Sequence, residues 1–169
     1  MASELYVETL KGLTSGANAN KVIIPSGQTL YAPGHVIQVV GANDIMTATN
    51  TNSTSFTATT LAATITPTST SSKILVAATF SATQDGGSNE QAQVTIYRGT
   101  TNLRPSGTCN FMYDHPGGNV GFSGTYMVYD SPATTSATTY TVYIKVSGSS
   151  SYFRAIAGTD TITVMEIAG

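Results

Sequence analysis

The chain has 169 residues and a formal net charge of −2, and only 9% of its residues are charged, far below the roughly 25% of ordinary soluble domains. It has no basic run and no apolar stretch near the ~20 residues of a membrane helix, so we expect neither nucleic-acid binding nor membrane insertion. Hydrophobic residues make up 40% of the chain in regular short runs, which argues against disorder. Ser and Thr supply about a quarter of the residues, so the surface is expected to be polar but largely uncharged.

The first 35 residues are typical of an extended arm rather than of a packed domain. Gly and Pro break this region into apolar fragments that are too short to bury a core alone. Its apolar side chains would be exposed unless the arm docks on something else. We therefore expect a docking arm over residues 1–35 and one domain over residues 36–169, with an edge strand of the chain's own sandwich as the alternative. The arm residues expected to dock are Leu5, Tyr6, Val7, Val22, Ile23 and Ile24.

Alternation of apolar and polar residues dominates the rest of the chain. In Tyr140–Val146 the even positions are large and apolar and the odd positions mostly polar, which predicts a strand with one face on a core. Lys73–Phe80 alternates more weakly and is expected to be buried on both faces. Turn-forming residues separate the runs at short intervals, so we expect an all-β, antiparallel β-sandwich that is jelly-roll-like. The other expected strands are Val36–Val40, Leu61–Ile65, Gln91–Tyr97, Val120–Val128, Tyr152–Ile156 and Thr161–Ile167.

Five phrases of the sequence are familiar as an ordered set: Glu4–Gly12, Ala32–Val40, Ile65–Val76, Tyr129–Tyr140 and Thr161–Gly169. Together they resemble a family of small structural proteins of phages that infect cyanobacteria and other aquatic bacteria. The resemblance covers most of the chain, but Asp85–Asn119 matches no familiar pattern. It implies a trimeric jelly roll of the complement and tumour-necrosis-factor type.

Members of this family are components of the virion, so the resemblance implies a capsid decoration protein on the outer surface of the particle. The expected partners are two further copies of the chain and the major capsid protein on which the arm docks. The alternative is a short tail fibre or receptor-binding tip whose arm attaches to a tail adaptor. A free lectin-like module would explain the loops but not the arm. The single Cys109 cannot form an internal disulfide, which fits synthesis in the host cytoplasm.

The closing strand departs from simple alternation. Ile162, Val164 and Glu166 fall on one face, and Met165 and Ile167 fall on the other. Either a bulge near Met165 resets the register, or both faces are covered. The second case suits an inner strand near a subunit contact, as the jelly-roll resemblance implies. The expected oligomer contacts are therefore Ile162, Val164, Met165 and Ile167.

Catalysis has weak support, and we expect no enzyme, no cofactor and no bound metal. Cys109, Asp114 and His115 could be drawn as a thiol site, but adjacent side chains of an extended chain point to opposite faces. The remaining ordinary base is His35. One weak metal candidate is the loop with Asp85, Asn89 and Glu90, which a turn between two strands explains more simply.

Contact with a host surface glycan is the remaining hypothesis. Exposed tyrosines stack on sugar rings, but tyrosines on strands more often fill space at sheet edges or subunit contacts. The chain has no Trp. The expected exposed tyrosines include Tyr143 and Tyr152, and the candidate surface-binding residues are Tyr97, Tyr113, Asp114 and His115.

Overall fold

The computed structural model describes residues 14–17, 23–24, 26, 32–44, 50–85, 90–104, 109–113, 120–149, 152–155 and 160–169. Of Asp44, Asn50, Asp85, Cys109–Tyr113 and Phe153–Ala155 it describes the backbone alone. The chain divides into two units, Met1–Ala32 and Pro33–Gly169. In the first unit, Ile23 and Ile24 are 55% and 41% exposed. Leu5, Tyr6, Val7 and Val22 lie outside the described residues. The role of this region as a docking arm stays a prediction.

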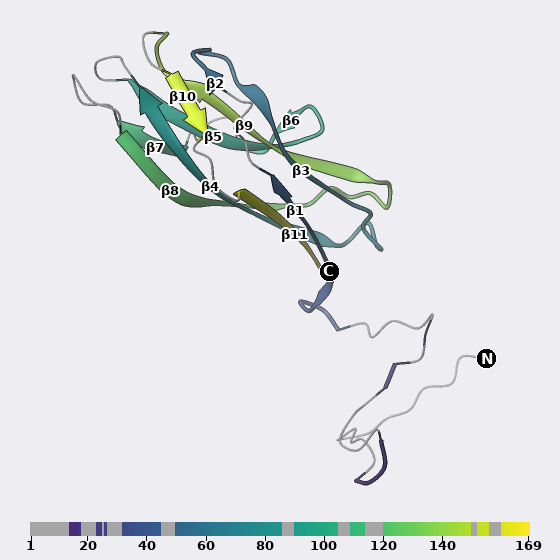
Figure 1. Cartoon of the computed structure of the whole chain (residues 1–169). Helices are drawn as coiled ribbons and strands as arrows, with labels where there is room; N and C mark the ends of the chain where they lie inside the picture. Colours follow the sequence, from purple (N-terminus) through teal and green to yellow (C-terminus); the bar gives the residue numbers. More distant parts are fainter. Residues whose placement is uncertain are drawn as a thin grey trace. The chain divides into compact units, whose positions relative to one another are not determined.

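The second unit is all-β, as the alternation predicted, and none of its described residues is helical (Figure 1). Among the described residues no helix is long and apolar enough to cross a membrane. The strands are β1 (Val36–Asp44), β2 (Asn50–Thr51), β3 (Thr57–Ile65), β4 (Lys73–Asp85), β5 (Gln91–Arg98), β6 (Thr101–Asn102), β7 (Cys109–Tyr113), β8 (Val120–Asp130), β9 (Thr138–Val146), β10 (Tyr152–Ala155) and β11 (Asp160–Ile167).

These strands form two antiparallel sheets that pack face to face as a β-sandwich (Figure 1). In sheet A, β11 and β10 follow one another along the same edge of β4, β1 and β2 lie outside them, and β8 pairs with the other edge of β4. In sheet B the order is β3, β9, β5, and both β6 and β7 pair with the far edge of β5. Each sheet thus has four strand positions. We count β1 with β2, β6 with β7 and β10 with β11 as one position each and number the eight positions along the chain. The order is then 1-8-3-6 in sheet A and 2-7-4-5 in sheet B, which is jelly-roll-like.

The core between the sheets follows the predicted alternation closely. In β9 the even residues Tyr140, Val142, Ile144 and Val146 are fully buried. In β4 the prediction of burial on both faces is wrong for the single chain. Its even residues face the core, while Leu75 and Ala77 are half-buried and Thr79 is exposed. The outer face of sheet A is therefore open.

Buried polar residues satisfy the backbone where the strands of sheet A are interrupted. Asp160 begins β11, and its Oδ1 accepts a hydrogen bond of 3.0 Å from Ser81 N, at the point of β4 that lies between its β11 and β10 pairings. Three residues further along β4, Gln84 donates to Glu90 O at 3.0 Å and accepts from Ala92 N at 3.1 Å. These contacts explain why a carboxylate and an amide face a core, because a buried polar group is tolerated only when it is hydrogen-bonded.

The closing strand β11 keeps one register along β4 from Thr161 to Ile167. A bulge near Met165, the first of the two alternatives for this strand, is therefore excluded. The irregularity lies in the partner strand β1, between Val36 and Gln38. β11 is an inner strand of sheet A with strictly alternating burial, and Glu166 occupies a core-facing position.

Candidate functional site

The start of β1 is tied to the end of the chain at one end of the sandwich, here called the base. Gly34 N donates to Ala168 O at 2.8 Å, and Ala168 N donates to His35 O at 2.9 Å. Gly34 has a φ of 84°, a backbone conformation that residues with a Cβ rarely adopt. A glycine at this position therefore allows the chain to turn into β1. The bonded pair holds the root of the N-terminal region against the closing strand.

Glu166 lies at this base with no exposed surface and accepts four hydrogen bonds. Oε2 accepts from Gln38 Nε2 at 2.6 Å. Oε1 accepts from Thr68 N at 2.7 Å, Thr68 Oγ1 at 2.8 Å and Ser72 Oγ at 2.6 Å. One carboxylate thus joins β1, the loop between β3 and β4, and β11. We call this arrangement the Glu166 clamp.

The Glu166 carboxylate is held as an anion by neutral donors. Burial alone would raise its pKa, but the hydrogen bonds from Ser72, Gln38 and Thr68 outweigh burial and hold the pKa below its usual value of 4.5. Hydrogen bonds to a charged acceptor are about twice as strong as neutral ones. The clamp is therefore strongest when Glu166 is ionised.

A second polar cluster joins the two sheets at the base. Arg98, the last residue of β5, donates through one guanidinium nitrogen to both carboxylate oxygens of Asp130, each at 2.9 Å. The buried phenol of Tyr140 donates to Asp130 Oδ2 at 2.8 Å. Burial, and then this hydrogen bond, raise the pKa of Tyr140, so the phenol stays protonated. The cluster connects β8 of sheet A with β5 and β9 of sheet B.

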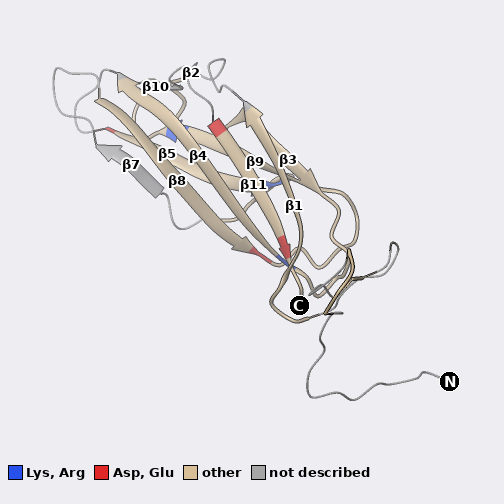
Figure 2. Ribbon diagram, turned by 60° about the horizontal axis from the view of Figure 1, so that its bottom comes forward, with Lys and Arg blue, Asp and Glu red and all other residues tan. Residues whose placement is uncertain are grey.

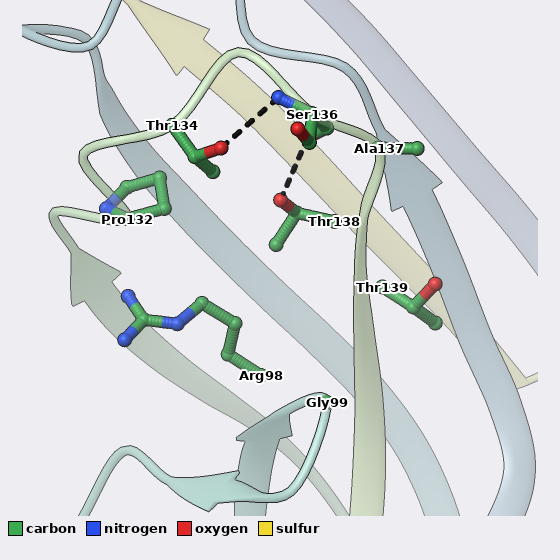
Figure 3. Close-up of a pocket in the computed structure, with 8 residues that line it drawn as sticks. All are labelled: Arg98, Gly99, Pro132, Thr134, Ser136, Ala137, Thr138 and Thr139. Carbon is green, nitrogen blue, oxygen red and sulfur yellow. Dashed lines mark hydrogen bonds between the residues drawn. The ribbon is translucent and has the colours of Figure 1, made fainter.

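Next to Arg98 the surface is hollowed to a volume of about 450 Å³ (Figure 3). The Thr134 hydroxyl accepts from Ser136 N at 3.1 Å, and the Thr138 hydroxyl donates to Ser136 O at 2.9 Å. These bonds shape the loop between β8 and β9, and no nucleophile–base pair is found among the lining residues. The hollow is lined by Arg98, Gly99, Pro132, Thr134, Ser136, Ala137, Thr138 and Thr139.

The outer face of sheet A carries a contiguous apolar surface. Val39, Met165, Leu75 and Tyr129 stand directly opposite one another across β1, β11, β4 and β8. Residues that are opposite in an antiparallel pair share a face, so these side chains form one row. Val39, Met127 and Tyr129 are 56%, 50% and 58% exposed. We define the apolar patch as Val36, Val39, Leu75, Met127, Tyr129, Met165 and Ile167.

The outer face of sheet B is finished by contacts within the chain. Tyr97 and Tyr143 stack with ring centroids 3.9 Å apart, and Phe56 packs edge-on to Tyr97 at 6.2 Å. Beside them Thr95 is fully buried and donates to Asn102 Oδ1 at 2.8 Å. Among the described side chains of this face, the large aromatic groups thus cover each other.

The expected oligomer contacts divide between these two environments. Ile162 and Val164 are fully buried in the core of their own chain, so their assignment to a subunit contact is wrong. Met165 and Ile167 are half-buried on the opposite face, within the apolar patch. The alternation along β11 distinguishes the two pairs.

The remaining candidate residues are scattered or lie outside the described residues. Tyr97 belongs to strand β5 rather than to a loop, and Tyr152 is 43% exposed on β10. Asn89, Asp114 and His115 are not described, and Tyr113, Cys109 and Asp85 are described by backbone alone. Glu90 lies against Gly148, where a Cβ would overlap its carboxylate. Among the described residues, no group of three or more His, Cys, Asp or Glu is placed to hold a metal ion.

Two features of the base were missed by reasoning from the sequence. The Glu166 clamp carried a signal, because a carboxylate at a core-facing position of a strand needs buried donors. The signal for the Arg98–Asp130–Tyr140 cluster was weaker. Tyr140 is a core position whose hydroxyl needs a partner, but the partner's identity depends on which strand ends meet.

The sequence matches no protein-family model, and a search of curated proteins found no significant match. The resemblance to phage structural proteins therefore stays a prediction based on the phrases quoted above.

Proposed function

We propose that this protein is a structural subunit on the outer surface of a bacteriophage particle. In this proposal it is a capsid decoration protein that forms a homotrimer and holds the shell through residues 1–32. The observation that carries the proposal is the fixed root of the N-terminal region. Gly34, His35 and Gln38 are bonded to the closing strand. A domain that projects from a shell needs its attachment segment joined firmly to its core, and the base of this sandwich supplies that joint.

The character of the surface supports a structural role. The strands carry few charged residues (Figure 2), and on sheet A hydroxyls face each other in pairs. Thr79 and Thr125 are 2.9 Å apart, and Ser81 and Ser123 are 2.7 Å apart. A surface of this kind exerts little electrostatic steering, whether water or another copy of the chain covers it. It suits a protein that covers a particle more than one that captures a charged ligand.

Binding to capsids stripped of the protein tests the role of residues 1–32. A variant that starts at Pro33 keeps the bonds of Gly34 and His35 to Ala168, so it should remain folded. We expect this variant to lose capsid binding, and the full chain with Ile23→Ser and Ile24→Ser to bind more weakly than the unmodified chain. Full decoration of capsids by the Pro33 variant would contradict the docking role.

Copy number per virion separates decoration from the alternative, a short tail fibre or receptor-binding tip. Quantified gel bands should give hundreds of copies for a decoration protein and a dozen or two for a tail appendage. The second result would indicate that residues 1–32 attach to a tail adaptor and not to the major capsid protein. Absence of the protein from purified particles would contradict both locations.

A further inference from the structure

Among the described residues of the second unit, the exposed large apolar side chains all lie on sheet A. They are Val36, Val39, Met127, Tyr129 and Tyr152. Leu75 and Met165 fill the row between Val39 and Tyr129 and are half-buried. Monomeric proteins rarely leave a contiguous apolar surface of this kind open, and such surfaces mark sites of association.

The charge on this face favours a second copy of the same chain as the occupant. Lys73 is the one charged residue among the described side chains of β1, β4, β8 and β11 that point outward, and it donates to Ser131 Oγ at 2.9 Å at the base. Among the described side chains, copies that turn this face toward a shared threefold axis therefore bring no like charges together apart from Lys73. A strongly charged partner, in contrast, would find little to pair with.

The size of the face matches what a stable contact needs. β4 has 13 residues, which at about 3.3 Å each give a length of roughly 40 Å. Four strand positions spaced by about 4.8 Å give a width of roughly 19 Å. The product, about 800 Å², equals the surface that each partner contributes to a standard protein–protein interface.

We propose that the outer face of sheet A is the contact between copies of this chain, with the apolar patch at its centre. The inference deepens the proposed function, because it rests on a subunit that assembles with itself. It moves the contact away from Ile162 and Val164, which face the core. It adds Val39, Leu75, Met127 and Tyr129 to the two outward residues of the closing strand.

Light scattering coupled to size-exclusion chromatography of the full chain tests the proposal. We expect the unmodified chain to elute as an oligomer and Tyr129→Thr to weaken self-association by about tenfold or more, as for a buried aromatic at an interface. The matched control is Tyr143→Thr, the same substitution on the outer face of sheet B, which should leave the oligomer intact. Met127→Asp should dissociate the oligomer, and Thr60→Asp, on an exposed position of β3, should not.

Oxidation of Met127 by peroxide provides a measurement that needs no variant. Its side chain is 50% exposed in the single chain, so oxidation should slow as the protein concentration rises through the range of assembly. A monomeric unmodified chain, or a rate that does not depend on concentration, would overturn the proposal. So would an oligomer that survives both Tyr129→Thr and Met127→Asp, and that result would leave capsid attachment through residues 1–32 untouched. Loss of capsid binding by the variant that starts at Pro33, with its oligomer intact, would support the docking role of residues 1–32 and the contact through sheet A together.

Discussion

Sheets A and B bury the same core but treat their outer faces differently. Sheet B covers its large side chains from within the chain, through the stack of Tyr97 on Tyr143 and the packing of Phe56. Sheet A leaves Val39, Met127 and Tyr129 at least half exposed. Among the described side chains, sheet B is thus covered within one chain, whereas sheet A leaves an apolar face open, the face at which we propose the contact between copies.

The inner faces differ as well. The core-facing residues of β9 in sheet B from Tyr140 to Val146 are apolar apart from one phenol hydroxyl. β11 in sheet A begins its core-facing row with Asp160 and ends it with Glu166, both buried. The core-facing row of β11 thus ends in two buried carboxylates, whereas that of β9 from Tyr140 to Val146 is held mainly by packing. The predictions below test this contrast.

The largest expected effect is at the Glu166 clamp. Glu166→Lys places a cation among the donors of Gln38, Thr68 and Ser72 and should lower the free energy of unfolding by about 3–5 kcal/mol, as an uncompensated buried charge does. Glu166→Gln keeps the shape but loses charge-assisted bonds, and should cost about 2 kcal/mol. Urea denaturation measures both. Equal stability of Glu166→Lys and the unmodified chain would mean that the clamp contributes nothing.

The same residue predicts a dependence on pH. Because the pKa of Glu166 is lower in the folded chain than in the unfolded chain, the unfolded chain binds a proton first as the pH falls. The stability that Glu166 supplies is therefore complete above about pH 5 and is lost as the pH falls through its folded pKa. Urea denaturation between pH 6 and pH 3 should give a shallower pH dependence for Glu166→Gln than for the unmodified chain. Identical slopes would show that another carboxylate dominates.

A smaller effect is expected where the two sheets are joined. Tyr140→Phe removes the hydrogen bond to Asp130 but keeps the packed ring, and should lower the free energy of unfolding by about 1 kcal/mol. Thermal or urea unfolding measures the change. Tyr129→Phe is the matched control on sheet A, where the Tyr129 side chain is 58% exposed. A larger loss for Tyr129→Phe than for Tyr140→Phe would contradict the importance of this cluster.

The last prediction compares the same substitution on the outer faces of the two sheets, where we expect small effects on stability. Under monomeric conditions Tyr143→Thr should lower the free energy of unfolding by about 1 kcal/mol, because it breaks an aromatic pair. Tyr129→Thr should change it by less than about 0.5 kcal/mol, since the side chain is 58% exposed. The reverse order would mean that sheet A, not sheet B, is completed within one chain.

The sequence predicted the sandwich because alternation is local. Tyr140–Val146 and Gln91–Tyr97 give the right strands from spacing alone, since successive side chains of a strand point to opposite faces. The segment Lys73–Phe80 was predicted to be buried on both faces because two of its odd positions, Leu75 and Ala77, are also apolar. That apolar character is real, but within one chain nothing covers Leu75 and Ala77 fully.

The candidate surfaces were harder to predict because they depend on pairing. The row from Val39 to Tyr129 joins residues from four strands that lie far apart in the sequence, and their alignment follows from register. Ile162 and Val164 were assigned to a subunit contact because the sequence does not tell which face of β11 meets the core. The Glu166 clamp likewise needs the loop between β3 and β4 to close over the end of β11.

The hydroxyl pairs on sheet A have a consequence for the conditions under which the protein works. Contacts such as Thr79 with Thr125 and Ser81 with Ser123 involve no ionic groups, and dissolved salt screens only interactions between charges. An interface centred on uncharged side chains should therefore not weaken between dilute buffer and concentrated brine. The low content of charged residues in the sequence thus predicts that the assembled protein tolerates changes in ionic strength.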